Sequence, residues 1–513
     1  MNPSSSSTTP EILLQKYAQG ERDFSDISLN ECTLSGAKLP HIVLQRASLK
    51  VVNLSTANLS YSDLSGAILN VSRLNGTNLS QACLQKAQLN VANLIRAVLV
   101  GADLAEASLI RAELLRADLS NANLAKANLQ EADLREARLR WTRLNGANLS
   151  QCDLRNSSLL GANLSSAQLY SAKLDGATLS GSVLLRAELR HANLQSADLS
   201  GANLRGANLR WANLSGANLQ EADLTDAKLS GANLMGARLS GATLENTTLV
   251  HADLSRTNFQ GVYCVNSDLS GATLTGTSMH GAVCYDVQTM ETVFEWVDLS
   301  PSGDRSQVHQ FNQATDIHAF LNHRPPRVQV IVDLALTQAA HAILATAYEQ
   351  IGQAVALFDR PPHIEVTHRR TTLTFIAQEE ASLAMISYLA TWPFQDGITV
   401  QATLVDLMEQ KTNNPNILDP QEEDHQKLHE AITILERQEL QPLQRKMGQY
   451  SFFAAPIQVK LSNRNGKILE LYHNPRFGVR NLPPTDGLFP IQSGYLPAPQ
   501  PQEYLIFLSA SSD

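Results

Sequence analysis

Residues 192–211 read ANLQSADLSGANLRGANLRW, and Leu occupies every fifth position of this stretch. The register continues without an insertion or a deletion from Phe24 to Leu299, and all 46 positions from Leu29 to Leu254 are Leu. A small residue, usually Ala, stands two positions before each Leu, and Asn or Asp usually precedes the Leu directly. The repeating unit is therefore A(D/N)LXX.

A period of five residues fits neither an α-helix, which has about 3.6 residues per turn, nor a flat strand, which has a period of about two. It fits a short extended step followed by a corner, in which the Leu and the small residue point inward and the other residues point to water. A single coil buries too little apolar surface to offset its backbone entropy. We therefore expect the repeats to be stable only when they stack.

The tandem, uninterrupted A(D/N)LXX unit resembles the pentapeptide-repeat proteins over a little more than half of the chain. The resemblance implies a mainly β fold for residues 24–299, a right-handed, four-sided β-helix with about four repeats per coil. At the usual spacing of paired strands, about 14 such coils form a rod of roughly 65 Å. The run LQKYAQGERDF at 14–24 also resembles the lead-in of many cyanobacterial members of that family.

The N-terminal segment is predicted to close the rod. Residues 1–8 are rich in Ser and Thr and are predicted to be a disordered tail. Residues 9–23 are predicted to form a capping helix, with Thr9 as N-cap, Pro10 in the first turn and Ile12, Leu13 and Tyr17 on its apolar side. Such a helix would protect the open core and strand edge of a β-helix.

Beyond residue 260 the repeat becomes irregular and the composition then changes. Residues 300–313, SPSGDRSQVHQFNQ, are predicted to be a linker, and 314–513 an α+β domain of no recognised family. We expect strands at 327–336, 363–368, 371–377, 397–407 and 503–509, helices ending near 358 and at 379–391 and 420–440, and a hairpin at 463–466. The first six elements follow the ferredoxin-like order β-α-β-β-α-β.

The charge is unevenly distributed, although the whole chain carries a formal net charge of −9. Residues 24–260 contain 22 Lys and Arg against 19 Asp and Glu, a net charge of +3. Some pentapeptide-repeat proteins are regarded as acidic DNA mimics that bind DNA gyrase, and the near-neutral rod disfavours that function. Nucleic-acid binding is also not expected, because it requires a clear basic excess.

Five Cys in 513 residues do not indicate a disulfide framework. Cys264 and Cys284 lie one expected coil apart, with Cα atoms near 5 Å and thus within disulfide range. We nevertheless expect buried thiols that act as small hydrophobes. The sequence contains neither an apolar run of about 20 residues nor an apparent signal peptide, so a cytoplasmic protein without a membrane span is expected.

Catalytic and metal-binding motifs are scarce. The sequence lacks a phosphate-binding Gly-rich loop, a Cys-x-x-Cys pair and a Gly-x-Ser-x-Gly turn. His425 and His429 are spaced to share one face of a helix, but no third ligand is evident for a zinc ion. We therefore favour a solvated polar face at this position and expect no metal and no cofactor.

The outward residues of the rod are more informative, because residues 20 apart should stack on successive coils. Arg190 and Arg210 fall in one such column, with His191 and Trp211 beside them and Tyr170 one coil earlier. Trp, Tyr and Arg are enriched at interface hot spots. Two stacked Arg repel each other, and no acidic residue precedes or follows them in their column. Another group is therefore expected to compensate their charge.

A second column places Ile95 over Leu115 at outward positions. Exposed apolar residues on a rod that otherwise presents polar residues suggest a contact surface. The alternative is drift among the repeats, because single exposed apolar residues are ordinary.

These observations favour a non-enzymatic scaffold that binds a protein partner through the rod, while the C-terminal domain supplies specificity or assembly. Formation of a homo-oligomer remains open. One alternative is a regulator of DNA gyrase, or of another nucleic-acid enzyme, that acts by mimicry. A second alternative is a ligand-sensing or metal-sensing C-terminal domain.

Overall fold

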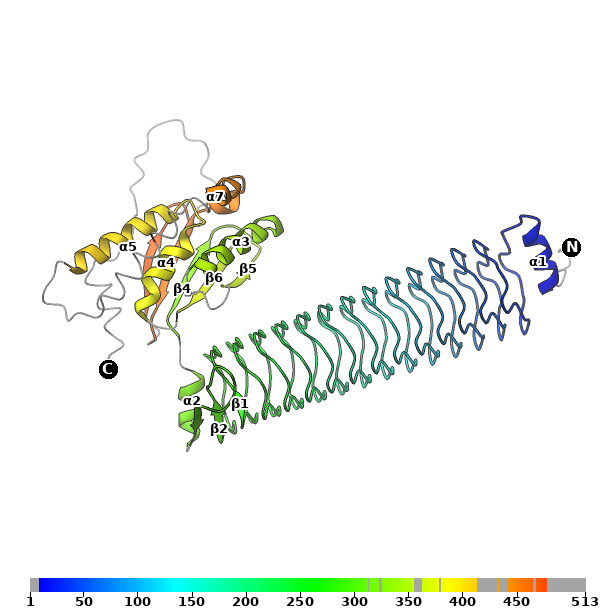
Figure 1. The fold of residues 1–513 in the computed structure, drawn as a ribbon, viewed down its shortest axis with the longest axis horizontal. Helices are drawn as coiled ribbons and strands as arrows, with labels where there is room; N and C mark the ends of the chain where they lie inside the picture. Colours follow the sequence, from blue (N-terminus) through cyan, green and yellow to red (C-terminus); the bar gives the residue numbers. More distant parts are fainter. Residues whose placement is uncertain are drawn as a thin grey trace. The chain divides into compact units, whose positions relative to one another are not determined.

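The computed structural model describes residues 9–311, 313–322, 325–354, 362–377, 380–412, 432, 441–464 and 467–477. The chain divides into two compact units, Met1–Asn322 and His323–Asp513. The first unit contains the repeats and the second contains a five-stranded sheet with helices (Figure 1). Among the described helices, none combines the length and the hydrophobicity needed to cross a bilayer.

The repeats form a rod of stacked coils (Figure 1). Each residue that precedes a core Leu forms a parallel bridge with the residue 20 positions later, from Asp23↔Val43 to Thr273↔Val293. A coil therefore contains 20 residues and four repeats, as the resemblance implied. Backbone hydrogen bonds join the coils in both directions. The N–H of Leu49 donates to the carbonyl oxygen of Ile68 (2.8 Å), and the N–H of Ile68 donates to that of Ala47 (2.9 Å).

The corners between repeats are tight turns. The carbonyl of a core Leu accepts a hydrogen bond from the N–H three residues later, as at Leu34 and Ala37 (3.1 Å). The second residue after the Leu has a positive φ, which is 67° at Gly36, as a type II turn requires. Gly adopts this backbone without strain, yet Val51 adopts it too, with a φ of 58°. The corner positions therefore tolerate side chains only at a cost in stability.

Helix α1 (Pro10–Ala18) caps the N-terminal end of the rod, as predicted. The Thr9 side chain accepts a hydrogen bond from the N–H of Ile12 (3.4 Å). Leu13 is fully buried in the same core as the Leu column, and the Tyr17 hydroxyl donates to the carbonyl oxygen of Pro40 (2.7 Å). Ile12, which was expected on the buried side, is 42% exposed. The helix covers the core with one Leu and one Tyr.

The C-terminal end of the rod is capped partly by residues of the predicted linker, 300–313, and partly by the first residues of the predicted α+β domain, 314–513, so both of those boundaries were wrong. Strand β1 (Thr277–Ser278) pairs in parallel with β2 (Trp296–Asp298), and β2 pairs antiparallel with β3 (Val308–Gln310). Helix α2 (Ala314–Leu321) buries its Ile317 and Leu321 in the core of the rod. The rod unit therefore runs to Asn322, and 300–311 folds back as part of the cap. The composition of this segment, which is rich in Ser, did not indicate the short pairing of β2 with β3.

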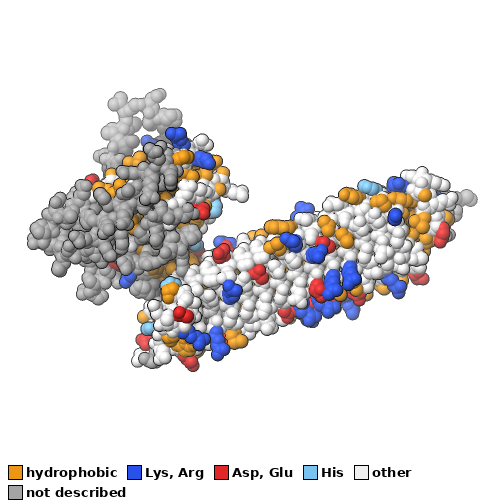
Figure 2. Space-filling view, viewed as in Figure 1, with side chains coloured by type: hydrophobic (Ala, Val, Ile, Leu, Met, Phe, Trp, Pro, Cys, Tyr) orange, Lys and Arg blue, Asp and Glu red, His pale blue; other side chains and the backbone are white. Residues whose placement is uncertain are grey.

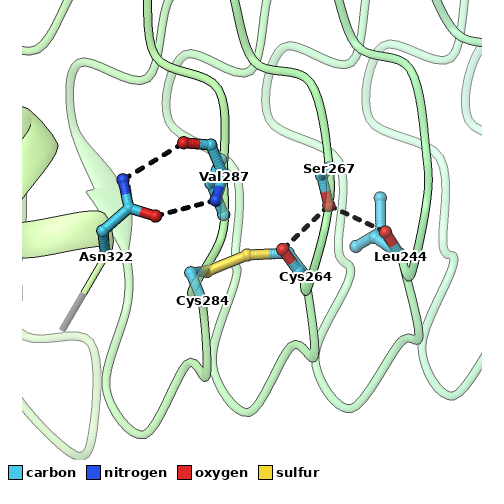
Figure 3. The surroundings of a disulfide bond; sticks show 6 residues. All are labelled: Leu244, Cys264, Ser267, Cys284, Val287 and Asn322. Atoms are coloured by element: carbon cyan, nitrogen blue, oxygen red, sulfur yellow. Dashed lines mark hydrogen bonds between the residues drawn. A yellow bond between two sulfur atoms is a disulfide. The ribbon is translucent and has the colours of Figure 1, made fainter. Parts of the chain in front are cut away.

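Asn322 closes the last coil with its side chain (Figure 3). Its Oδ1 accepts a hydrogen bond from the N–H of Val287 (2.7 Å), and its Nδ2 donates to the carbonyl oxygen of the same residue (3.1 Å). A side-chain amide carries one acceptor and two donors, as a peptide group carries one of each. Asn322 thus satisfies backbone groups that would otherwise need a further coil.

Cys264 and Cys284 form a disulfide between successive coils, with Cα atoms 4.8 Å apart (Figure 3). The expectation of two free buried thiols was therefore wrong, although the expected Cα separation was correct. Cys264 is itself packed next to Ser267, whose hydroxyl donates to the carbonyl oxygens of Cys264 (2.8 Å) and Leu244 (2.9 Å). The disulfide ties the irregular last coils to the regular ones.

We expect reduction of this disulfide to destabilise the C-terminal end of the rod. A cross-link that closes a loop of this length contributes about 3 kcal/mol by the chain-entropy estimate. Urea unfolding of the oxidised and the reduced protein measures the difference, and a Cys264→Ala/Cys284→Ala variant should not respond to reductant. Thiol titration of the oxidised, unfolded protein should detect the three remaining thiols, Cys32, Cys83 and Cys152. Titration of all five would contradict the pairing.

Asp298 organises the start of the C-terminal cap. Its side chain is buried, and it accepts hydrogen bonds from the N–H (2.9 Å) and the hydroxyl (2.6 Å) of Ser300 and from the N–H of Arg305 (3.0 Å). Burial alone would raise the pKa of this carboxyl, but the hydrogen bonds outweigh it and lower the pKa. The carboxylate therefore stabilises the folded cap above the ordinary aspartate pKa of about 3.9.

We expect Asp298→Asn to destabilise the rod by about 1–3 kcal/mol at pH 7, because an amide cannot accept all three hydrogen bonds. The difference from the wild type should shrink as the pH falls through the lowered pKa, because the wild type then loses the same stabilisation. Urea unfolding of both proteins between pH 7 and pH 3 measures this dependence. A difference that stays constant over this range would argue against the role of the charge.

The second unit contains an antiparallel sheet in the order β5-β6-β4-β7-β8. The strands are β4 (Arg327–Val332), β5 (His363–Val366), β6 (Thr371–Ile376), β7 (Ile457–Ser462) and β8 (Ile468–His473). The helices are α3 (Gln338–Ala354), α4 (Leu383–Thr391), α5 (Gly397–Thr412) and α7 (Gln441–Met447), with 3₁₀ turns at Glu380–Ser382 and Ser451–Ala454. The strands expected at 327–336, 363–368 and 371–377 and the helix at 379–391 are present within a few residues. Strands β7 and β8 pair antiparallel on either side of the hairpin expected at 463–466, of which 465 and 466 lie outside the described residues.

The strand expected at 397–407 was wrong, because this segment forms helix α5. Its β-branched residues favour a strand by propensity. The structure instead buries Val400 and Leu404, four residues apart on one helical face, and leaves Ile398 77% exposed. Strand β7 occupies the place beside β4. The end of the helix expected near 358, most of the helix at 420–440 and the strand at 503–509 lie outside the described residues.

Candidate functional site

Three aromatic side chains form a continuous row on one side of the rod. Tyr170 and His191 lie edge to face with ring centroids 5.7 Å apart, and His191 stacks on Trp211 at 5.2 Å. The 20-residue coil produces this row, because Leu169, Leu189 and Leu209 direct the residues that follow them to the same side. We call Tyr170, His191 and Trp211 the aromatic ladder.

The ladder ends where Trp211 lies over Gly231. A Cβ atom on Gly231 would come within 2.6 Å of the indole, so only Gly leaves room for this ring. Tyr170 and Trp211 nevertheless remain 42% and 56% exposed. The rings are fixed by one another and by the backbone, and they present their outer edges to solvent. Rigid, partly exposed aromatic groups bind partners with little loss of side-chain entropy.

Two arginines flank the ladder. The Arg190 guanidinium lies 5.8 Å from the ring centroid of Tyr170, and its Nε lies 3.3 Å from Oε2 of Glu188. Glu188 therefore supplies the charge compensation that the column itself lacks, from the same repeat as Arg190. Arg210 is half-buried and forms no ion pair with any residue that the structure describes. One free and one paired guanidinium thus border the rings.

This arrangement is suited to binding and not to bond cleavage. Exposed Trp, Tyr and Arg provide large apolar edges and bidentate donors for carboxylates. Among these side chains, His191 is the one ordinary acid–base group, and both its neighbours in the ladder are aromatic. The five residues that the sequence singled out here, Tyr170, Arg190, His191, Arg210 and Trp211, are therefore brought together by the fold.

Ile95 and Leu115 lie on a different side of the rod, several coils nearer the N-terminus. They stack on successive coils, and the N–H of Arg96 donates to the carbonyl oxygen of Leu115 (3.0 Å). Both side chains are half-buried and do not project as an exposed patch. The structure confirms their column but does not join them to the aromatic ladder.

The more exposed apolar residues were not among the predicted contact residues, and they occupy the corner position, two residues after a core Leu. Val51, Val71 and Val91 stack on three successive coils and are each at least 50% exposed, and Trp141 is 60% exposed. The corner position itself could have identified them, because it is the most exposed position of the repeat.

Figure 2 shows hydrophobic side chains toward the N-terminal end of the rod and Lys and Arg gathered along its middle, on the face in view.

The second unit offers one cluster of titratable groups on β7 and β8. Oε1 of Glu470 accepts hydrogen bonds from Nε2 of Gln458 (2.5 Å) and from Nδ1 of His473 (2.7 Å). Burial raises the pKa of Glu470, but these hydrogen bonds and the imidazole lower it overall. No nucleophile joins this group among the described contacts, so its hydrogen bonds serve to pair the two strands.

No group of three or more His, Cys, Asp or Glu within the described residues is arranged to hold a metal ion. His425 and His429, the weak metal candidates, lie outside those residues.

We expect Gly231→Ala to displace the Trp211 ring, because the new Cβ would overlap the indole. Gly236→Ala is the matched control, because its φ is also 67° and no atom lies within 4 Å of the added Cβ. Both variants carry the same backbone strain of roughly 1–2 kcal/mol. In 5-fluorotryptophan-labelled protein, the Trp211 signal should shift only in Gly231→Ala. Equal shifts in both variants would contradict the stacking.

Comparisons with known proteins agree with the repeat geometry. The Pentapeptide repeats family matches overlapping segments that together run from 27 to 276. HetL, a pentapeptide repeat protein involved in heterocyst differentiation regulation from the cyanobacterium Nostoc sp. strain PCC 7120, is 34% identical over 52% of this chain and 97% of its own, with a TM-score of 0.21. A search of curated proteins found no match.

Two further solved structures are less similar. A pentapeptide repeat protein from the Arabidopsis thaliana thylakoid lumen is 30% identical, covering 22% of this chain and 68% of its own, with a TM-score of 0.12. QnrB1, a plasmid-mediated fluoroquinolone resistance protein, is 15% identical, covering 53% of this chain and 90% of its own, with a TM-score of 0.12. From the family match and the similarity to HetL, the chain belongs to the pentapeptide-repeat family, whose repeats form a right-handed β-helix.

Proposed function

We propose that this protein is a non-enzymatic scaffold whose rod binds a protein partner through the aromatic ladder and the arginines beside it. The observation that supports the proposal most directly is the row of stacked, exposed rings held rigidly at 5.2–5.7 Å spacing. A rigid rod keeps such a surface in one conformation, so little entropy is lost on binding. The partner would contribute apolar groups to the ring edges and a carboxylate to Arg210.

The second unit is proposed to supply specificity or assembly, including formation of a homo-oligomer. We also propose that it is ferredoxin-like. In support, β4, α3, β5, β6 and α4 follow one another in the order β-α-β-β-α, β7 comes after the further helices α5 and α7, and β5-β6-β4-β7 are neighbours in an antiparallel sheet. Strand β7 would then be the fourth strand of the unit, with β8 added at the edge. Fold alone assigns no activity to this unit.

Two other functions receive less support. Regulation of DNA gyrase by mimicry would require an acidic rod, whereas residues 24–260 carry 22 Lys and Arg against 19 Asp and Glu. A ligand-sensing or metal-sensing function of the second unit depends on His425 and His429, about which the described residues give no information. A scaffold function requires only the surface that the rod presents.

The proposal is tested by affinity capture of partners from a lysate of the source cells. We expect the full-length protein to retain a partner that Arg190→Ala/Arg210→Ala/Trp211→Ala loses, because the variant removes both guanidinium groups and the exposed indole. Truncation of a central hot-spot residue typically costs about 2 kcal/mol or more, which is a loss of about 30-fold in affinity. The affinity of the purified pair, measured by calorimetry, quantifies the loss.

The matched control is Arg238→Ala/Arg256→Ala, which removes two exposed arginines from other sides of the same rod. Its partner affinity should equal that of the wild type. If the ladder variant still binds every partner of the wild type, or if partners are lost only when 323–513 is disrupted, the rod is a spacer and the proposal fails.

A further inference from the structure

A second cluster of Trp and Arg lies on the opposite side of the rod from the aromatic ladder. Arg140 and Trp141 follow Leu139, and Arg143 begins the next side of the same coil. Leu139 and Leu209 are 70 residues apart, which is three and a half coils of 20 residues. They therefore lie on opposite sides of the rod. All three side chains of the cluster are exposed, and Trp141 is 60% exposed. We call Arg140, Trp141 and Arg143 the Trp141 corner.

The position of Trp141 is costly for a side chain of this kind. Its φ is 58°, in the left-handed region, which is strained for a residue with a Cβ. The same corner of the next three coils is occupied by Gly161, Gly181 and Gly201. Burial of the indole returns little of this energy, because most of the ring is exposed. Other corners also hold non-Gly residues with a positive φ, such as Val51, but Trp141 adds a large, mostly exposed ring that packing does not require, and this combination suggests a functional surface.

The indole is held in place by the coil that follows. It lies flat over Gly161, where a Cβ atom would come within 2.2 Å of the ring carbons. In the ladder, Trp211 lies over Gly231 of the next coil in the same way. Trp141 therefore presents a fixed outer edge and face to solvent, with little conformational freedom to lose when a partner binds.

The charge around the Trp141 corner is strongly positive. On the two sides that meet there, residues 118–126, 138–146 and 158–166 contain four cations, Lys126, Arg138, Arg140 and Arg143, and one carboxylate, Asp118. Asp118 lies 3.6 Å from Arg138. Arg140 and Arg143 form no ion pair with any residue that the structure describes. By contrast, Arg135 and Arg155 on a neighbouring side are bonded to Asp133 and Asp153.

We propose that the Trp141 corner binds an acidic segment of a partner protein. Two carboxylates of the segment bind the guanidinium groups of Arg140 and Arg143 as charge-assisted, bidentate hydrogen bonds. The chain between these carboxylates crosses Trp141 and packs on its indole. This site is independent of the ladder, so one rod carries two partner sites on opposite sides.

The extent of the cluster favours a peptide over a nucleic acid. In the columns of Arg140 and Arg143, the coils on either side carry Ser120 and Leu160, and Asn123 and Asn163. Along these two columns the basic surface is therefore one coil wide, with Lys126 as the one cation that the neighbouring coils add on these two sides, and about 5 Å separates successive coils. A nucleic-acid strand needs a basic groove that follows its phosphates over several nucleotides. Two carboxylates on a short peptide need only the two guanidinium groups.

The test uses the full-length protein and a fluorescein-labelled 12-residue peptide of alternating Glu and Ser, with binding measured by fluorescence anisotropy at moderate salt. We expect Arg140→Gln/Arg143→Gln to weaken binding by at least about tenfold, because the variant loses the charge-assisted hydrogen bonds to both carboxylates. Arg238→Gln/Arg256→Gln removes the same charge elsewhere on the rod and should bind within about twofold of the wild type.

A glycine pair separates the role of the ring from that of charge. Gly161→Ala should displace Trp141 and weaken peptide binding while every charge is kept. Gly181→Ala, in the same column with a φ of 61° and no atom within 4 Å of the added Cβ, should bind as the wild type does. Thermal unfolding confirms that each variant is folded. The Arg190→Ala/Arg210→Ala/Trp211→Ala variant should also bind the peptide normally, which distinguishes this site from the ladder.

Three results would overturn the proposal. The first is an equal loss of affinity in the two arginine pairs, since that would indicate attraction to the whole rod. The second is the absence of saturable peptide binding at millimolar concentration. The third is tighter binding of a labelled 12-nucleotide oligothymidine, lost in Arg140→Gln/Arg143→Gln, since the corner would then be a nucleic-acid site.

Discussion

The rod depends on one interaction, the backbone hydrogen bonding of each coil to the next over a shared column of Leu. A coil of 20 residues buries four Leu, and this burial alone does not offset the entropy of ordering 20 residues. Each coil becomes stable because its N–H groups and carbonyls are paired above and below, as Leu49, Ile68 and Ala47 illustrate. Stability is therefore a sum of contacts between neighbours along one dimension.

A one-dimensional stack has two ends, and most of the irregular structure in this unit serves to close them. Helix α1 places Leu13 on the first coil, and α2 places Ile317 and Leu321 on the last. Asn322 replaces the missing backbone partners of Val287, and the disulfide between Cys264 and Cys284 secures coils in which Leu has been replaced. At the two ends, side chains thus supply the apolar contacts and hydrogen bonds that neighbouring coils supply to the interior coils.

The same geometry explains how ordered rows of side chains arise on the outside of the rod. Residues 20 apart are stacked, so a few substitutions in one column produce an ordered row, as Tyr170, His191 and Trp211 do. The corners require a positive φ, and a Gly on the next coil gives a large ring the space to lie flat, as under Trp141 and Trp211. Opposite sides of the coil present different side chains, as the proposed scaffold function requires.

The sequence by itself determined the rod, because an uninterrupted Leu register permits only one distribution of inward and outward residues. It also determined which residues share a column, and hence the composition of the ladder. Only the tertiary structure decided how the ends close and which charges pair. Chain reversals and local side-chain geometry, which no sequence period encodes, determine the partners of Gln310, Asn322 and Glu188.

In the second unit, Val400 and Leu404 fit a strand or a helix equally well by sequence, and packing selected the helix because β7 pairs with β4 instead. The exposed corner of Trp141 likewise became apparent only with the positive φ of its backbone and the Gly beneath its ring.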